Sequence, residues 1–430
     1  MKNSLPTYVG AMFKGNQFPN KMKKLLQINT VSNSGSTGRI AEEIGLCAMH
    51  QGWESYIAYG RGDRPSASYK FRIGSDLMMY TNAIRARLFD SEGFTAEYAT
   101  NKLVEFIQRI KPDIIHLHNI HGYYLNVEIL FKYVAAVNIP VVWTLHDCWS
   151  LTGHCTHFDY VNCSKWKTLC FQCPQKSSYP ASFFADRSEK NYLKKKELFT
   201  SVEQMTIVTV SQWLNNIVNK SFLKNYPIKV INSGIDTNVF KPIFNGEMRK
   251  NYKLDGKFVI LGVASIWSQR KGLSDFIALS RIIDTNSIII LVGLNPKQTK
   301  DLPSNIIGIS RTENIRELAE LYSTANVYVN TSVEETFGLT NVEALSCGTP
   351  IIVYNATACP ESVSTETGLI VAKNNVPALW EAIQEVKLKG KGHYSAHCVE
   401  RAHALYRKED RNNEYIYLYN NLLKNRIAKQ

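Results

Sequence analysis

The feature that most constrains this chain is an alternation of short apolar runs with longer amphipathic segments. It begins at Lys24 with the run KLLQINT, passes through the turn VSNSGSTGR, and shows helical spacing in IAEEIGLCAMHQG. The apolar runs SYIAYG, IIHLHN and VVWTLHD follow, with helical segments between them. Strands that alternate with helices are typical of a parallel sheet covered by helices on both faces. We therefore expect an α/β fold.

The alternation occurs twice, with a break between the two halves. The segment 235–257 is polar and rich in turn-forming residues, and the strand FVILGVAS then restarts the pattern. A chain of 430 residues is also too long for one ordinary core. We predict two doubly wound, Rossmann-like domains that face a central cleft, at residues 22–234 and 258–392. A helical segment at 393–430 follows them.

The first 21 residues carry no apolar core of the kind that a secretory signal needs. We expect either a disordered leader at 1–21 or a misassigned start ahead of Met22. No apolar run reaches the roughly 18 residues that a membrane-spanning helix requires. We therefore expect a cytoplasmic protein.

The net charge of +13 predicts attraction to an anionic partner. Phosphorylated ligands and an anionic membrane surface both fit, so a peripheral contact with the inner face of the cell membrane is one expectation. A solvated basic surface with no specific partner remains open. No helix-turn-helix, RNA-binding or zinc-finger signature occurs, and we expect no nucleic-acid partner.

Two turns follow strands and open helices, which is where backbone amides can receive an anion. In the first half, Gly35 and Gly38 would let a ligand approach the backbone, although a plain tight turn fits equally well. In the second half, Arg270 and Lys271 follow a strand and would lie beside such amides. This pair predicts a diphosphate site. The alternative that stays open is two exposed basic residues at a helix start, where they would oppose the helix dipole.

Two glutamates, Glu335 and Glu343, flank a glycine turn at the start of a predicted helix. The first can accept hydrogen bonds from sugar hydroxyls, and the second can hold the vicinal hydroxyls of a ribose, because a carboxylate accepts two donors at once. Glu334 is expected to be exposed. The amides at this turn come from three residues: Phe337, Gly338 and Leu339.

Together, the segments EETFGLTNVEALSCGTPII, PESV with TGLIV, QRKG and INSGIDTNVF resemble the family-4 glycosyltransferases. These are retaining enzymes of the GT-B fold. The resemblance covers nearly the whole chain, from about Lys23 to the C-terminus. It implies that Glu335 contacts the donor sugar, that Glu343 holds the ribose of the nucleotide, and that Lys271 binds the phosphates.

Further roles are implied by the same resemblance. The strand end HLHN matches a family histidine near the transferring carbon, which we assign to His118, whereas His116 would point to the opposite face and pack in the core. His146 and Asp147, at the next strand end, are expected acceptor contacts. Many family members carry an arginine where this chain has Ser265, and Arg270 is the candidate to replace it.

The resemblance also implies a mechanism and a set of ligands. Transfer would occur on one face of the sugar, with the leaving phosphate helping to deprotonate the acceptor, and Glu335, Lys271 and His118 would be the catalytic residues. No D-x-D stretch occurs, so we expect no metal-dependent diphosphate clamp and no cofactor for catalysis. The donor would be a UDP- or GDP-sugar, and the acceptor a saccharide, free or lipid-linked.

A cysteine-rich segment at 148–174 follows the strand end TLHD and would lie on the acceptor side. Cys155, Cys163, Cys170 and Cys173 have the spacing C-x7-C-x6-C-x2-C. Two interpretations remain open: a structural zinc site, or reduced or partly paired thiols. A similar loop is associated with the bacterial exopolysaccharide enzymes of the colanic-acid type.

The sequence thus predicts a glycosyltransferase of exopolysaccharide or capsule biosynthesis. Two alternatives share the nucleotide site: a nucleotide-sugar 2-epimerase of the GT-B fold, and a protein that binds a nucleotide sugar without turnover. The first would need carboxylates placed for proton abstraction.

Overall fold

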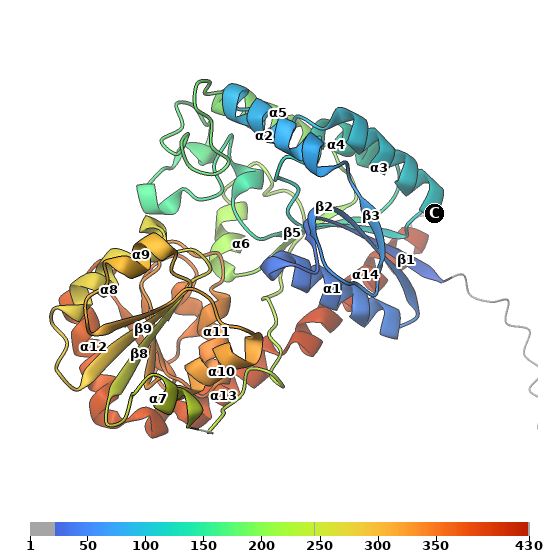
Figure 1. Cartoon of the computed structure of the whole chain (residues 1–430). Coiled ribbons are helices and arrows are strands. Elements are labelled where there is room, and N and C mark those ends of the chain that lie inside the picture. The colour runs from blue at the N-terminus through green and yellow to red at the C-terminus, as the bar shows by residue number, and fades with distance from the viewer. Residues whose placement is uncertain (1–21, 245, 429–430) are drawn as a thin grey trace, which may run out of the picture.

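The computed structural model describes residues 22–244 and 246–428, so the predicted leader lies outside the described residues. Within them the chain forms two α/β domains, each built on one parallel sheet (Figure 1). The two parallel sheets confirm the α/β fold that the alternation of strands and helices predicted.

The first domain contains a seven-stranded sheet in the order β3-β2-β1-β4-β5-β6-β7. Strands β4 and β5 lie inside the sheet and every residue in them is buried, which is why their sequences read as continuous apolar runs. The strands are β1 (Lys23–Ser32), β2 (Trp53–Asp63), β3 (Tyr69–Arg72), β4 (Ile114–Leu117), β5 (Val141–Leu145), β6 (Met205–Thr209) and β7 (Ile228–Val230).

Helices cover both faces of this sheet (Figure 1). They are α1 (Gly35–His50), α2 (Asp76–Phe89), α3 (Glu97–Ile110), α4 (Val127–Ala136), α5 (Ser188–Phe199) and α6 (Gln212–Val218). Between β5 and α5 the cysteine-rich segment contains only short 3-10 turns, at Trp149–Leu151, Asp159–Val161 and Lys165–Lys167.

The second domain contains a six-stranded sheet in the order β10-β9-β8-β11-β12-β13. Its strands are β8 (Phe258–Val263), β9 (Ser287–Val292), β10 (Ile306–Ile309), β11 (Val327–Asn330), β12 (Ile351–Tyr354) and β13 (Gly368–Val371). Its helices are α7 (Glu247–Asn251), α8 (Leu273–Ser280), α9 (Pro296–Lys300), α10 (Ile315–Thr324), α11 (Leu339–Ser346), α12 (Val376–Lys389) and α13 (Lys391–Tyr406), with 3-10 turns at Gln269–Lys271 and Cys359–Ser362.

The last helix, α14 (Lys408–Ala428), returns to the first domain and packs beside α1 and β1 (Figure 1). Tyr415, Ile416 and Tyr419 are buried there in the core that α1 shares with the sheet. The Tyr419 hydroxyl lies 2.6 Å from Nδ1 of His116, which is fully buried. The expectation that His116 packs in the core is confirmed. The expectation that it points to the face opposite His118 is wrong, because residues i and i+2 of a strand share a face, and the two ring centroids lie 4.0 Å apart.

The chain passes between the domains twice, and the two passages pair with each other. The Ile235 amide donates to the Tyr406 carbonyl at 2.8 Å, and the Lys408 amide donates to the Ile235 carbonyl at 3.0 Å. A Cβ on Gly234 would lie 2.4 Å from the Lys408 Cα, so a glycine is needed for this close approach.

Both sheets are doubly wound, and in each the strand order reverses next to the first strand of the domain. The reversal lies between β1 and β4 in the first sheet and between β8 and β11 in the second. Ligands of open α/β sheets bind outside the carboxyl ends of the strands at this reversal point. A ligand of this fold is therefore expected to bind near the residues that follow β1, β4, β8 and β11.

Candidate active site

The strand reversal in the second domain brings together two segments that are distant in sequence. Lys271 follows β8 and Glu335 follows β11, and the Lys271 ammonium forms an ion pair with a Glu335 carboxylate oxygen. Arg270 lies beside them, with its guanidinium 3.9 Å from the other oxygen of Glu335. All three side chains are mostly buried but keep some exposure.

The ion pair sets the charge state of Glu335. Burial raises the pKa of this carboxyl, but Lys271 and Arg270 outweigh the burial and bring the pKa to about 2. Glu335 is therefore ionised at any physiological pH. The arrangement holds two cations and one anion at the edge of the sheet where a ligand of this fold would bind.

Two glycines make this arrangement possible. Gly272 has φ +72, and a Cβ there would lie 2.5 Å from the Thr331 carbonyl oxygen, so the turn after Lys271 can approach β11 closely only with glycine. Gly338 has φ +88 and caps α11, which begins at Leu339 as the sequence predicted. Phe337 is buried beside it.

Glu343 lies in α11, the helix that follows the turn at Gly338. Its carboxylate accepts a hydrogen bond from the Tyr322 hydroxyl at 2.9 Å. Burial raises the pKa of Glu343 to about 7, and the Tyr322 hydrogen bond and the charge of Arg39, on α1 of the first domain, only partly offset it. Glu343 is thus poised between its neutral and ionised forms near neutral pH.

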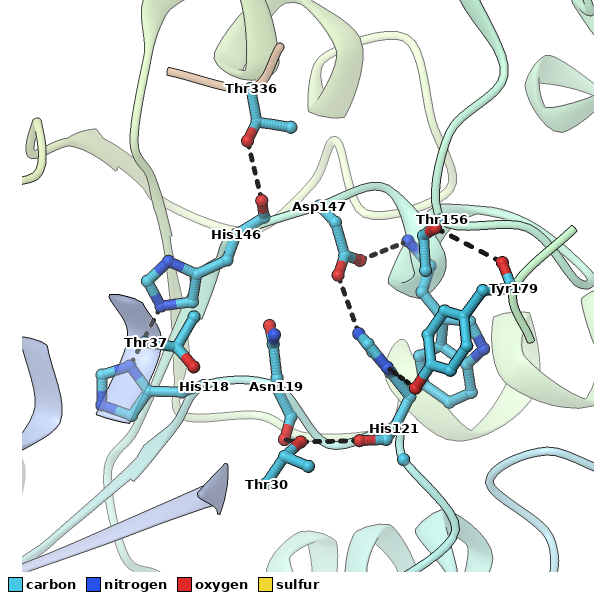
Figure 2. Close-up of polar contacts among 12 residues, drawn as sticks. Thr30, Thr37, His118, Asn119, His121, His146, Asp147, Thr156, Tyr179 and Thr336 are labelled. Carbon is cyan, nitrogen blue, oxygen red and sulfur yellow. Dashed lines mark hydrogen bonds and ion pairs between the residues drawn. The ribbon is translucent and has the colours of Figure 1, made fainter. Parts of the chain in front are cut away.

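In the first domain, two histidines at neighbouring strand ends contact each other (Figure 2). Nδ1 of His118 lies 3.2 Å from Nε2 of His146, and Nε2 of His118 lies 3.0 Å from the Gln27 side-chain oxygen. His118 is therefore buried with both ring nitrogens occupied. Burial lowers the pKa of His118 well below its usual value, which keeps the ring neutral.

His146 is the more accessible of the two rings, and burial lowers its pKa to about 4. Beside it, Asp147 accepts a hydrogen bond from Nε2 of His121 at 2.7 Å, and Nδ1 of His121 lies 3.1 Å from the Tyr179 hydroxyl (Figure 2). Burial raises the pKa of Asp147, but its interaction and hydrogen bond with His121, together with the Trp149 amide, bring the pKa down to about 2. His118, His121, His146 and Asp147 line one small pocket.

Gly35 and Gly38, at the start of α1 after β1, differ in role. Gly35 has φ +61 and opens α1 with no protein atom near the position of a Cβ. A Cβ on Gly38 would lie 3.0 Å from the Val31 side chain, so Gly38 allows α1 to pack against the end of β1. Among the described residues, no hydrogen bond or ion pair joins either glycine to Lys271 or Glu335.

The two domains are joined directly at the candidate site. Glu334 is fully buried, and its two oxygens accept hydrogen bonds from the amides of Phe158 at 3.0 Å and Tyr160 at 3.1 Å. The Thr336 hydroxyl donates to the His146 carbonyl at 2.8 Å (Figure 2). The expectation that Glu334 is exposed is wrong, because its partners come from the cysteine-rich segment of the other domain.

Four of the five cysteines of that segment line one pocket together with His154, namely Cys155, Cys163, Cys170 and Cys173. Cys155 and Cys173 are in hydrogen-bonding contact, and all four are free thiols. Within residues 22–244 and 246–428, however, no group of three or more His, Cys, Asp or Glu side chains is placed to hold a metal ion. The structure gives the zinc interpretation no support.

Sequence reasoning missed several residues of this region: Gln27, His121, Tyr179, Tyr322 and Thr336. His121 lies two residues beyond the segment HLHN, which was the available signal. The others act through contacts over long sequence separations, which no local pattern reveals.

The fold and these two groups of side chains define a glycosyltransferase of the GT-B class. Two family models match the chain, "Glycosyltransferase Family 4" over residues 38–239 and "Glycosyl transferases group 1" over residues 257–387. The first domain thus matches the family-4 glycosyltransferases and the second matches the group-1 glycosyltransferases.

Individual relatives agree with this assignment. WcaC of Escherichia coli (strain K12), whose name places it among the glycosyl transferases of colanic acid biosynthesis, is 25% identical over 419 residues, 93% of this chain and 100% of WcaC. Sucrose-phosphate synthase of Thermosynechococcus elongatus has a similar fold, with a TM-score of 0.69 at 18% identity over 94% of this chain and 99% of that one. HepE of Anabaena, solved in complex with UDP, gives a TM-score of 0.66 at 14% identity over 93% and 100% of the two chains.

Proposed function

We propose that the protein transfers a sugar from a nucleotide-sugar donor to a saccharide acceptor, with retention of the anomeric configuration, in the biosynthesis of a bacterial polysaccharide. The single observation that carries the proposal is the grouping of Lys271, Arg270 and Glu335 at the strand reversal, with Glu343 on the following helix. The similarity to WcaC supports the polysaccharide role.

In this proposal each charged group has one task. Lys271 and Arg270 neutralise the diphosphate of the donor, and Glu335, which stays ionised, accepts hydrogen bonds from hydroxyls of the transferring sugar. Glu343 holds the ribose, because its second oxygen is not used by Tyr322. The amides at Gly338 and Leu339 add positive potential at the start of α11.

The transfer requires one bond to break and one to form on the same face of the sugar. The bond from the anomeric carbon to the phosphate oxygen breaks, and the acceptor oxygen bonds to that carbon. The acceptor proton passes to the departing phosphate oxygen. The protein supplies orientation and charge stabilisation, which together can provide much of the rate enhancement.

We assign the histidine beside the transferring sugar to His146 and give His118 a supporting role. His118 has both ring nitrogens occupied and is buried, whereas His146 is partly accessible and is held by His118. Asp147, held by His121, is the proposed contact for an acceptor hydroxyl.

A peripheral contact with an anionic membrane would bring the enzyme to a lipid-linked acceptor, and the surface around α2 supports it. Leu77, Tyr80 and Ile84 lie on one side of this helix with exposures of 74%, 66% and 41%. A neighbouring pocket is lined by four cations: Arg85, Arg187, Lys190 and Lys194. Exposed apolar side chains next to basic ones favour the interface of an anionic bilayer. No helix of the described residues is long and apolar enough to cross a membrane.

The experiment that tests the proposed function is a thermal-shift screen with UDP, GDP and their sugar conjugates, on the wild type and Glu343→Ala. UDP and its glucose conjugate belong in the panel because HepE structures contain them. At a ligand concentration of about 100 times Kd the stabilisation is about 2.7 kcal/mol, which is readily detected. A shift with one nucleotide that weakens in the variant supports the proposal, whereas no shift with any nucleotide contradicts it.

A further inference from the structure

The cysteine-rich segment carries a histidine, His157, that the proposed mechanism does not use. The residues on both sides of it are fixed, each to a different domain. The Thr156 carbonyl accepts a hydrogen bond from the Cys148 amide at 3.0 Å, within the first domain. The Phe158 amide donates to Glu334 of the second domain at 3.0 Å. The backbone at His157 therefore spans the boundary between the domains.

The neighbour of Glu334 in sequence is Glu335, so the contact that holds Phe158 also places His157 near the proposed donor site. The charged groups that act on the His157 ring are Arg270, Lys271 and Glu335 from the second domain and Asp147 from the first. These are the groups to which the proposed function gives the diphosphate, the transferring sugar and the acceptor. His157 lies among all of them.

One ring nitrogen of His157 has a hydrogen-bond partner, and the other has none among the described residues. Nδ1 of His157 lies 2.9 Å from the Thr156 hydroxyl oxygen, whereas Nε2 has no hydrogen-bond partner among the described residues. His157 as a residue is partly exposed. Burial, followed by the charge of Arg270, lowers the pKa of His157 to about 4, and the ring is neutral at neutral pH.

We propose that His157 is a substrate-contacting residue that hydrogen-bonds through Nε2 to a sugar hydroxyl at the point where donor and acceptor meet. The inference rests on the proposed function and adds to it a residue from the cysteine-rich segment. A hydroxyl is the fitting partner because it can donate to a neutral imidazole or accept from it, whichever ring nitrogen carries the proton. A neutral ring beside two cations is less suited to hold the diphosphate itself.

This placement also explains why the segment is attached to Glu334. A loop of 27 residues would not hold one side chain at a reaction centre without a fixed point near it. The two amides that Glu334 binds lie one and three residues beyond His157. Glu334 is thus a positioning residue, which contacts the segment and not the substrate.

The first test measures the accessibility of His157 without any need for an acceptor. Diethyl pyrocarbonate modifies neutral histidines, and mass spectrometry locates the sites. The probe is the one nucleotide sugar, among UDP-glucose, UDP-N-acetylglucosamine, GDP-mannose and GDP-fucose, that gives the largest thermal shift. We expect it to protect His157 at least fivefold, with no protection of the exposed His50. Equal modification of His157 with and without this ligand would overturn the inference.

The second test compares His157→Ala and His157→Gln with the control His50→Ala. Loss of one hydrogen bond to substrate predicts a decrease of about tenfold in the rate of nucleoside diphosphate release from the same donor, with Kd for the nucleoside diphosphate unchanged and partial recovery in the glutamine variant. An unchanged rate, or a loss of nucleotide binding in parallel with the rate, would contradict the inference. If the wild type binds no nucleotide, the proposed function fails and the inference with it, whereas an active wild type and an equally active His157→Ala overturn the inference alone.

Discussion

Lys271 and Glu335 lie 64 residues apart in the sequence, yet their side chains form an ion pair at the carboxyl ends of two neighbouring strands. In the absence of a ligand, Glu335 and Lys271 neutralise each other. A donor diphosphate would take Lys271 as its partner and leave the Glu335 carboxylate available to sugar hydroxyls. The pair therefore holds both groups ionised and oriented before the donor binds.

Lys271→Ala is expected to lower kcat/KM for the donor by about 100-fold, because it removes one preorganised cation from the developing charge on the diphosphate. Steady-state kinetics with the donor found in the thermal-shift screen would measure this. Lys297→Ala is the matched control, since Lys297 lies in the same domain and is exposed. Equal losses in the two variants would point to a general charge effect and not to a phosphate contact.

The affinity for the nucleoside diphosphate is expected to rise between pH 6 and pH 8. The pKa of Glu343 is raised to about 7, so the carboxyl is mostly neutral at pH 6 and mostly ionised at pH 8, and only the ionised form accepts two ribose hydroxyls. Calorimetric titration at several pH values would show this, and Glu343→Gln corrects for the titration of the ligand's own phosphate. Tyr322→Phe should shift the wild-type curve to higher pH, because the Tyr322 hydrogen bond lowers the pKa of Glu343. Parallel curves for the wild type and Glu343→Gln would refute the assignment.

Glu334→Ala is expected to loosen the cysteine-rich segment. It leaves the amides of Phe158 and Tyr160 without their acceptor, and a buried donor without a partner costs about 1–3 kcal/mol. Hydrogen-exchange mass spectrometry should show faster exchange in peptides that span 156–162. The exposed Glu203 provides a control variant, Glu203→Ala. Unchanged protection at 156–162 would mean that other contacts hold the segment.

The double variant Leu77→Glu, Tyr80→Glu is expected to reduce binding to anionic vesicles at least tenfold, since each exposed apolar side chain contributes on the order of 1.5 kcal/mol when it enters the bilayer interface. Co-sedimentation with vesicles of phosphatidylglycerol and phosphatidylcholine would measure it. Leu388→Glu is the control, because Leu388 is 88% exposed on α12 of the other domain. Similar losses in the variant and the control would argue against a surface at α2.

Tyr419→Phe is expected to lower the free energy of unfolding by about 1–3 kcal/mol, because Nδ1 of the buried His116 loses its partner. Urea denaturation would measure the change. Tyr417→Phe is a close control, since Tyr417 lies on the same helix with 66% exposure. Equal stability in both variants would show that the hydrogen bond contributes nothing net.

Much of the fold could be predicted from the sequence, because the apolar runs and the helical spacing are local signals. The two parallel sheets, the GT-B architecture and the start of α11 at Leu339 are confirmed. Helices α2 and α5 were not predicted. α2 exposes apolar residues, and α5 has a low hydrophobic content, so neither shows the usual amphipathic pattern.

The candidate site could be predicted only in part. Glu335, Glu343 and Lys271 stand in recognisable segments, and the strand order brings Lys271 to Glu335. Glu334 could not be placed in the same way, because its partners, Phe158 and Tyr160, lie more than 170 residues away. The contact between Gln27 and Nε2 of His118 could not be predicted either, because it joins residues 91 positions apart.

The return of α14 to the first domain makes the second domain an insertion within the first. Because Tyr415 and Tyr419 complete the core beside α1, the first domain in the sequence needs the last residues of the chain. The inserted domain has its own sheet and its own helices, α7 to α13, and does not need α14. A chain truncated just before Lys408 should therefore hold a folded second domain and an incomplete first one.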